Sequence, residues 1–365
     1  MHRTISRRDL LKHSSSAALG ILLTGSRTTG LPQISGATYA LILELGHLIP
    51  KLLSEASVPG ASIALVRDGQ LIWRSGFGVK DNASKEPVDY NTMFEAASVS
   101  KTVFAYAVMK LCEKGVLDLD KPLTKYVSER FLEGDPRLDL ITARHVLSHT
   151  GGFQNWRSEK DPLKIQFQPG EKFSYSGEGY SYLQSVVTHL TGQPIETFMK
   201  AKIFVPFGMS SSGYVWNDVL AKRMAHPHDV KGNPLENNKP GSKEIARYAA
   251  AGELRTTPSD YTRFLIEVIE AKKTDGFRLS KESRDLMIHP QVKIDATTSW
   301  ALGWKIVHTE NGDLIVHGGD NTGFHAFAAA SVPRRCGLVF MTNGDNGPQV
   351  INKLILGETI QLFFK

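Results

Sequence analysis

The sequence predicts a protein of the α/β class, of the α+β type, in which one antiparallel sheet is flanked by helices and carries an inserted helical region. Strand-like alternation occurs near both ends of the chain, at about 55–80 and 300–345, and helical periodicity dominates between them. This order indicates a single sheet that both ends of the chain complete. The 365 residues are 41% hydrophobic, which is enough for a large core in one or two compact units.

The strands are predicted from alternating hydrophobicity and from turn residues. The dipeptide Asp68-Gly69 favours a tight turn, so the stretches on either side of it, 61–67 and 70–77, should form a hairpin. Four further strands are expected towards the C-terminus. They cover 302–307, 314–317, 325–332 and 337–342.

The helices are predicted from apolar spacing and from capping residues. Helices are expected at 41–54, 98–114, 142–148, 180–190, 257–271 and 350–364. The second of these has apolar residues on most sides, which indicates burial. Gly192 ends one helix, and Thr257 followed by Pro258 begins another. The domain at 41–365 should therefore have its sheet part at about 41–97 and 300–365 and its helical part at about 98–299.

Composition and motifs exclude several classes of function. The net charge is +6, but five basic residues and one acidic residue in the first 36 account for +4, so about +2 remains and no nucleic-acid partner is expected. Cys112 and Cys336 are expected to be buried free thiols, with a single bridge as the alternative. His226 and His228 flank Pro227 in an expected surface loop without a ligand cluster. No metal or other cofactor is predicted.

The first 40 residues are predicted to be an export signal and linker. Arg7-Arg8 followed by a short apolar run at 17–23 resembles a twin-arginine signal, and a basic disordered tail is the alternative. Cleavage is expected after Ala37 or Ala40. Because no later stretch approaches eighteen apolar residues, the mature chain should carry no stable membrane span. Together with the export signal, this predicts a periplasmic location.

The sharpest chemical signal is Ser98-Val99-Ser100-Lys101, which lies where a loop enters the predicted buried helix. Residues three apart share a helix face, so the Ser98 hydroxyl and the Lys101 amine can meet. The helix N-terminus favours an oxyanion beside Ser98, and burial would lower the pKa of the lysine so that it can help as a base. Taken alone, the pattern is equally consistent with an N-cap serine followed by a surface lysine.

Other segments place this pattern in a wider context. Tyr175-Ser176-Gly177 matches two positions of a Y-x-N pattern, and His317-Gly318-Gly319 matches H-x-G. Further matching segments are 58–62 (VPGAS), 145–152 (HVLSHTGG), 249–254 (AAAGEL) and 341–344 (MTNG). With these segments, the chain resembles the class C β-lactamases, the low-molecular-weight penicillin-binding proteins and related esterases over nearly all of its mature length.

The resemblance implies a β-lactamase/transpeptidase-like fold with its site in the groove between the sheet and the helical part. In that site Tyr175 and Lys101 would move the proton of Ser98 as a coupled pair, neither being singled out as the base. The alternative for Tyr175 is simple packing at a helix start. His145 and His149 belong to a family segment and are expected to hold a loop rather than to take part in the chemistry.

The same resemblance assigns the third motif to substrate binding. His317 would reach the serine, the tyrosine or a substrate carboxylate, while Gly318 and Gly319 let a substrate lie along the strand edge. The backbone N–H groups of Ser98 and Asp320 would form the oxyanion hole. The alternative is a glycine-rich turn with an incidental histidine.

The implied reaction is attack by Ser98 on a carbonyl, formation of an acyl-enzyme and hydrolysis by water. A small-molecule or peptidoglycan-like acyl substrate is expected, and esters, β-lactams and D-amino-acid peptides compete. Gly177 stands where the family has an asparagine that orients substrate amides, so an esterase or a broad hydrolase is favoured. The alternative is a non-catalytic penicillin-binding-like protein that is acylated without turnover.

Overall fold

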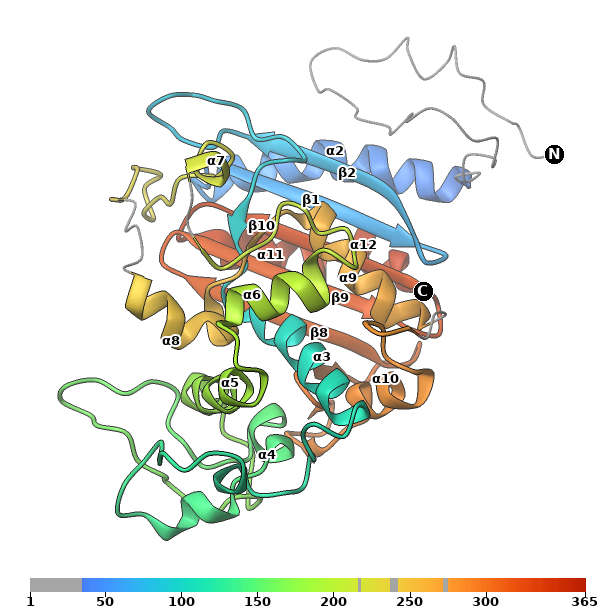
Figure 1. Cartoon of the computed structure of the whole chain (residues 1–365). Helices are drawn as coiled ribbons and strands as arrows, with labels where there is room; N and C mark the ends of the chain where they lie inside the picture. Colours follow the sequence, from blue (N-terminus) through green and yellow to red (C-terminus); the bar gives the residue numbers. More distant parts are fainter. Residues whose placement is uncertain (1–34, 216–217, 237–241, 272–274) are drawn as a thin grey trace.

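The computed structural model describes residues 35–215, 218–236, 242–271 and 275–365. Its centre is an eight-stranded antiparallel sheet with the strand order β2-β1-β10-β9-β8-β7-β6-β5 (Figure 1). The strands are β1 (Gly60–Arg67), β2 (Gln70–Gly78), β5 (Val292–Lys293), β6 (Thr298–Trp300), β7 (Lys305–Val307), β8 (Leu314–Asn321), β9 (Phe324–Ser331) and β10 (Cys336–Thr342). A separate short pair joins β3 (Phe94–Glu95) to β4 (Arg255–Thr256). The predicted fold class is confirmed.

The N-terminal hairpin is confirmed, whereas the first C-terminal strand begins later than predicted. Asp68 and Gly69 both have positive φ, 54° and 68°, as a tight turn of this kind requires. The strand expected from residue 302 begins at Lys305. The preceding residues turn instead, because the Ala301 N–H bonds the Trp304 carbonyl and Gly303 has a φ of 91°.

Both faces of the sheet are buried, and the side chains of β10 divide between them. Leu338 and Phe340 pack under α2 (Gly36–Glu55), α11 (Gly347–Leu356) and α12 (Glu358–Phe363). Val339 and Met341 belong to the larger core on the opposite face. Because successive strand residues point to opposite faces, the continuous apolar run of β10 serves two layers at once.

The helical part lies on that opposite face and extends beyond the sheet edge (Figure 1). Its helices are α3 (Ser100–Glu113), α4 (Ala143–Leu147), α5 (Gly177–Thr191), α6 (Ile195–Met199), α7 (Asp218–Ala221), α8 (Ser242–Gly252), α9 (Pro258–Glu270) and α10 (Lys281–Ile288). Nearly all of α3 is buried, as its sequence predicts. Gly192 ends α5 with a φ of 64°, and the Thr257 side chain caps α9.

The first helix begins five residues before the predicted start. The Ser35 side chain accepts the Thr38 N–H at 3.2 Å and so caps α2 at Gly36. The predicted cleavage points after Ala37 and Ala40 therefore fall in the first turns of α2. The arginine pair of the predicted signal lies outside the described residues. Within the described ranges, none of the helices combines the length and apolarity needed to cross a bilayer.

Two expectations about side chains need correction. Both cysteines are free, but only Cys336 is buried, whereas Cys112 is partly exposed. The loop around Pro227 is not wholly at the surface, because His228 is fully buried. Its Nδ1 donates to the Asn343 carbonyl at 2.9 Å, and its Nε2 accepts the Asn82 N–H at 3.1 Å. The two ring nitrogens thus tie the loop to the segments that follow β2 and β10.

Candidate active site

Ser98 and Lys101 meet at the start of α3. Ser98 lies in the 3₁₀ turn Ala97–Val99, which leads directly into the helix. The Lys101 amine donates to the Ser98 hydroxyl at 3.2 Å and to the Ala251 carbonyl at 2.5 Å. Ala97 has a φ of 45°, a left-handed conformation that costs a non-glycine residue about 1–3 kcal/mol. The strained turn sets the position of the hydroxyl above the helix N-terminus.

The Lys101 amine is fully buried, and no carboxylate is its hydrogen-bond or ion-pair partner among the described residues. Burial lowers its pKa from 10.5 to about 7. The rings of Tyr175, Tyr180 and Trp156 lie 4.9, 5.5 and 5.8 Å from its nitrogen. A large fraction of the amine is therefore unprotonated near neutral pH and can accept a proton.

Tyr175 presents a buried hydroxyl that makes no hydrogen bond of ordinary geometry within the described chain. Burial raises its pKa above the usual value, and the neighbouring Ser98 hydroxyl partly offsets that rise. The phenol therefore stays protonated at neutral pH and can give a proton. The centroid of its ring lies 4.9 Å from the Lys101 nitrogen and 6.3 Å from the centroid of the His317 ring.

His317 is buried at the edge of the same site. Its Nδ1 lies 2.6 Å from the Gly318 carbonyl, which can only accept, so Nδ1 carries the proton. Burial, together with the Lys101 charge, lowers the pKa of His317 to about 3. The ring is therefore neutral, and its Nε2 has a buried lone pair without a hydrogen-bond partner in the described chain.

His149 lies behind Tyr175, a position that sequence reasoning did not assign to it. Its ring contacts that of Tyr175, with centroids 4.2 Å apart and planes tilted by 33°. Its Nδ1 accepts the Ser176 N–H at 3.0 Å, so Nε2 carries the proton. Burial lowers the pKa of His149 well below its usual value, with a further contribution from Lys101. His149 is therefore a neutral ring in contact with Tyr175. His145, by contrast, caps α4 as expected of a loop-holding residue.

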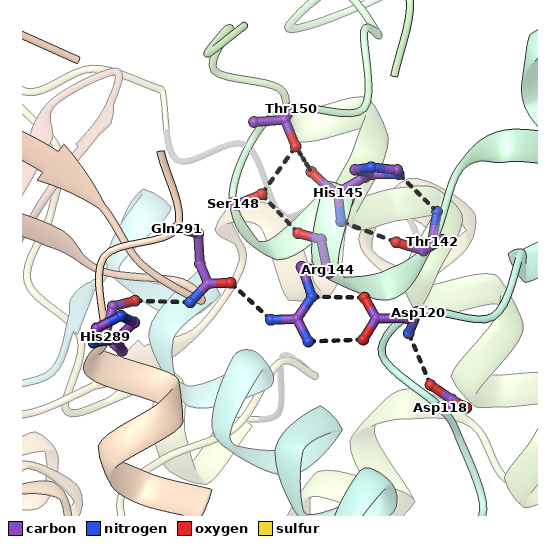
Figure 2. Close-up of polar contacts among 9 residues, drawn as sticks. All are labelled: Asp118, Asp120, Thr142, Arg144, His145, Ser148, Thr150, His289 and Gln291. Atoms are coloured by element: carbon purple, nitrogen blue, oxygen red, sulfur yellow. Dashed lines mark hydrogen bonds and ion pairs between the residues drawn. The ribbon is translucent and has the colours of Figure 1, made fainter. Parts of the chain in front are cut away.

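A polar network connects the segment that carries His145 and His149 to the sheet (Figure 2). Arg144 forms two hydrogen bonds with Asp120, at 2.6 and 2.8 Å, and a third with Gln291 at 2.7 Å. The Gln291 N–H in turn bonds the Trp300 carbonyl at 2.8 Å. Trp300 packs on the ring of His149, with centroids 4.9 Å apart. The network therefore connects the segments that carry His149 and Trp300, whose rings both contact Tyr175.

Strand β8 passes directly beside the serine turn. A Cβ on Gly319 would lie 2.4 Å from the Ala96 carbonyl oxygen and 3.0 Å from the Ser98 nitrogen, so glycine is required there. A Cβ on Gly318 would meet nothing within 4 Å. β9 pairs with one edge of β8 as far as Asn321, whereas β7 pairs with the other edge only as far as Val316. From His317 onward, this edge of β8 is therefore not covered by β7 and lies beside the serine turn, Ala97–Val99.

These groups open onto one cavity of about 620 Å³. The predicted residues that line it are Ser98, Tyr175, His317, Gly318 and Asp320, while Lys101 and Gly319 lie just beneath. Sequence reasoning missed other lining residues, which include Asn155, Trp156, Tyr248, Trp300, Lys305 and Asn321. No motif marked them, because they come from loops and strands that are distant in sequence.

The amino-acid sequence also identifies the family to which the chain belongs. A family model described as Beta-lactamase matches residues 45–356. The chain belongs to this family. Membership agrees with the resemblance found in the motifs around Ser98 and His317.

Similar proteins in this family have several different names. A penicillin-binding protein of Bacillus subtilis (strain 168) is 26% identical over 80% of the chain and 69% of its own length. Esterase EstB of Burkholderia gladioli is 28% identical over 54% of the chain and 57% of its own length. The solved structure of a beta-lactamase/D-alanine carboxypeptidase from Pseudomonas syringae superimposes with a TM-score of 0.75. The match covers 87% of this chain and 99% of that one at 19% identity, and it shows that the two share a fold. The family and these relatives support a function of the serine hydrolase type.

Proposed function

We propose that the chain hydrolyses carboxylic esters through an acyl-enzyme on Ser98. The observation that carries the proposal is the 3.2 Å contact between the Ser98 hydroxyl and an amine whose pKa burial lowers to about 7. A neutral amine at this distance can take the hydroxyl proton as the oxygen attacks. The esterase among the relatives supports the same direction.

The proposed reaction uses these groups in two steps. The Ser98 oxygen attacks the ester carbonyl while its proton passes to the pair formed by Lys101 and Tyr175. The oxyanion is held by the N–H groups of Ser98 and Asp320. The alcohol leaves with a proton from the same pair, and water then attacks the acyl-enzyme to release the acid and restore Ser98. His317 stays neutral throughout and accepts a hydrogen bond at Nε2.

The substrate preference for esters rests on Gly177. A glycine offers no side-chain amide to pair with a substrate peptide bond, and an unpaired amide in a dry site costs about 1–3 kcal/mol. An ester lacks the N–H that would need such a partner. The proposal therefore favours esters over peptides without depending on the identity of the leaving alcohol.

The decisive experiment compares purified wild-type protein with Ser98→Ala on a short-chain aryl ester. We expect repeated turnover by the wild type and none by the variant. A chromogenic cephalosporin and a D-Ala-D-Ala peptide, tested on the same pair, determine the substrate class. Equal rates for the wild type and the variant would contradict the assignment of Ser98.

A non-catalytic acyl acceptor is separated from an enzyme in the same samples. Such a protein would release one equivalent of alcohol and stop, leaving a stable adduct on Ser98 that intact-mass measurement detects. The proposal expects release to continue well beyond one equivalent.

Lys305 favours a second candidate, hydrolysis of substrates that carry a carboxylate, such as D-amino-acid peptides or β-lactams. Its side chain lines the cavity, and no acidic group forms an ion pair with it in the part of the chain that the structure describes. A lysine of this kind can bind a carboxylate as a point charge. Under this candidate, Lys305→Met raises KM for the peptide or cephalosporin and leaves KM for a neutral ester unchanged.

Export by a twin-arginine route to the periplasm remains a proposal that rests on Arg7-Arg8. Replacing both arginines by lysine in the full chain is expected to leave the protein in the cytoplasm, as measured by cell fractionation. Equal periplasmic amounts of both forms would contradict it. Sequencing the exported N-terminus determines whether cleavage follows Ala37 or Ala40.

A further inference from the structure

The first residue of α5, Gly177, is covered by the side chain of Trp156. A Cβ on Gly177 would lie 2.2 Å from Cη2 of the indole, 2.4 Å from Cζ2 and 2.5 Å from Cζ3. Gly177 is not among the glycines with positive φ, so it is space rather than backbone conformation that demands glycine here. The indole therefore takes the volume that any side chain at residue 177 would fill.

The backbone on both sides of Trp156 is fastened to the start of α5. The Asn155 side-chain oxygen accepts the Gly177 N–H at 2.9 Å, and its carbonyl accepts the Glu178 N–H at 3.0 Å. On the other side, Arg157 donates to the Glu178 carboxylate from its backbone at 2.9 Å and from its guanidinium at 2.7 Å. These contacts satisfy free N–H groups of the helix and hold Trp156 in place.

The glutamate that completes this attachment is fully buried, with no exposed surface. A buried carboxylate is maintained only when it is paired and hydrogen-bonded, and both contacts come from Arg157. An ion pair between the partly exposed Arg157 and the fully buried Glu178 therefore helps to hold the loop that carries Trp156.

Although it is fixed, Trp156 remains 43% exposed and lines the cavity above Ser98. Its ring lies edge-to-face with that of Tyr248, with centroids 5.2 Å apart and planes at 88°. Tyr248 lines the same cavity. Two aromatic rings therefore present apolar surface to the space in which a substrate must sit.

We infer that Trp156, with Tyr248 beside it, is a specificity-determining wall that binds a planar apolar group in the acyl part of the ester, and that Gly177 serves to admit the indole. The inference rests on the proposed ester hydrolysis and specifies the class of acyl group that the site prefers. A rigid aromatic surface binds such a group at little cost in side-chain entropy. The acyl part is the relevant one, since it stays on Ser98 after the alcohol has left.

The test uses methyl phenylacetate and methyl acetate, whose hydrolysis is followed by titration of released acid. Trp156→Ala is expected to lower the phenylacetate-to-acetate ratio of kcat/KM about three- to tenfold, mainly through KM, which is the factor that one aromatic pair supplies. Gly177→Ala should lower the ratio similarly, because its Cβ displaces the indole. The double variant should be no worse than Trp156→Ala alone.

Gly179→Ala is the matched control. It lies in the same helix, but its added Cβ would meet only ordinary contacts of 3.6 Å and more, so the ratio should not change. Thermal melting of each variant confirms that it is folded. A ratio unchanged in Trp156→Ala, or independent additive losses from Trp156→Ala and Gly177→Ala, would overturn the inference.

A second measurement separates this inference from the proposed function. Calorimetric binding of the two methyl esters to Ser98→Ala, with and without Trp156→Ala, gives the same preference without any turnover. If the wild type hydrolyses no ester but Ser98→Ala still prefers the phenylacetate through Trp156, the proposed function fails and the wall stands. If hydrolysis occurs but neither measurement depends on Trp156, only the wall fails.

Discussion

Replacing Lys101 by methionine should abolish activity and stabilise the protein at neutral pH. The fall in the Lys101 pKa from 10.5 to about 7 corresponds to roughly 5 kcal/mol of preference for the neutral amine in the folded state. Below about pH 7 the lysine is charged in both states, so the full penalty for burying that charge is present. Stability therefore rises with pH through the window from about 7 to 10.5, where the unfolded chain binds the extra proton.

The magnitude at a given pH follows from the same two pKa values. At pH 7 the folded state is still about 4 kcal/mol less stable than with a neutral lysine, and at pH 10 about 1 kcal/mol less. Methionine removes this penalty but leaves the Ala251 carbonyl without its 2.5 Å donor, which costs about 1–3 kcal/mol. We expect a net gain of about 2 kcal/mol at pH 7, which disappears or reverses near pH 10.

Denaturant unfolding at pH 6, 7, 8.5 and 10 measures this difference, and ester hydrolysis measures the loss of activity. Lys114→Met, at the exposed end of α3, is the matched control and should change stability by less than about 0.5 kcal/mol. A Lys101→Met protein that is less stable than wild type at pH 7, with a difference independent of pH, would refute the reasoning. Retained activity would refute the role of the amine.

Three further results are expected. Tyr175→Phe should lower kcat by about 10²–10⁴ while leaving stability unchanged or slightly raised, measured by kinetics and melting, since the lost hydroxyl is buried and unpaired. Gly319→Ala should abolish activity and lower the melting temperature because its Cβ would strike the Ala96 carbonyl, whereas Gly318→Ala should be tolerated; equal effects of the two would contradict the geometry. In wild type, log kcat/KM should rise with pH up to a single pKa near 7, that of Lys101, and His317→Asn should keep this limb because the pKa of His317 is about 3.

The sheet and the nucleophile could be predicted because their signals are local. The continuous apolar run of β10 indicates a strand buried on both faces, and the spacing of Ser98 and Lys101 places both on one side of a helix whatever surrounds it. Tyr175 and His317 needed the family resemblance, since nothing in the spacing of these residues brings a loop tyrosine and a strand histidine together. The structure places both rings at the same cavity.

The aromatic wall could not be predicted for a related reason. Trp156 lies in a loop without periodicity, and its place depends on bonds from its neighbours to α5, more than twenty positions later. The only local sign was the glycine at 177, which was interpreted as a missing amide rather than as space for another side chain. His228 was misjudged likewise, because its burial depends on Asn343 in a distant segment.

Several features that lower stability are found together at the active site. Ala97 and His149 adopt left-handed backbone conformations, Lys101 is buried without a carboxylate, and Tyr175 and His317 bury polar atoms that have no hydrogen-bond partner in the described chain. Each feature lowers stability by about 1 kcal/mol or more when taken alone. Such costs persist only where the surrounding packing determines the conformation, and here residues of α3, α5 and the sheet form one packed core beside the cavity. Because a substrate carbonyl could accept a hydrogen bond from the Tyr175 hydroxyl, a group that weakens the free protein is also one expected to stabilise the transition state.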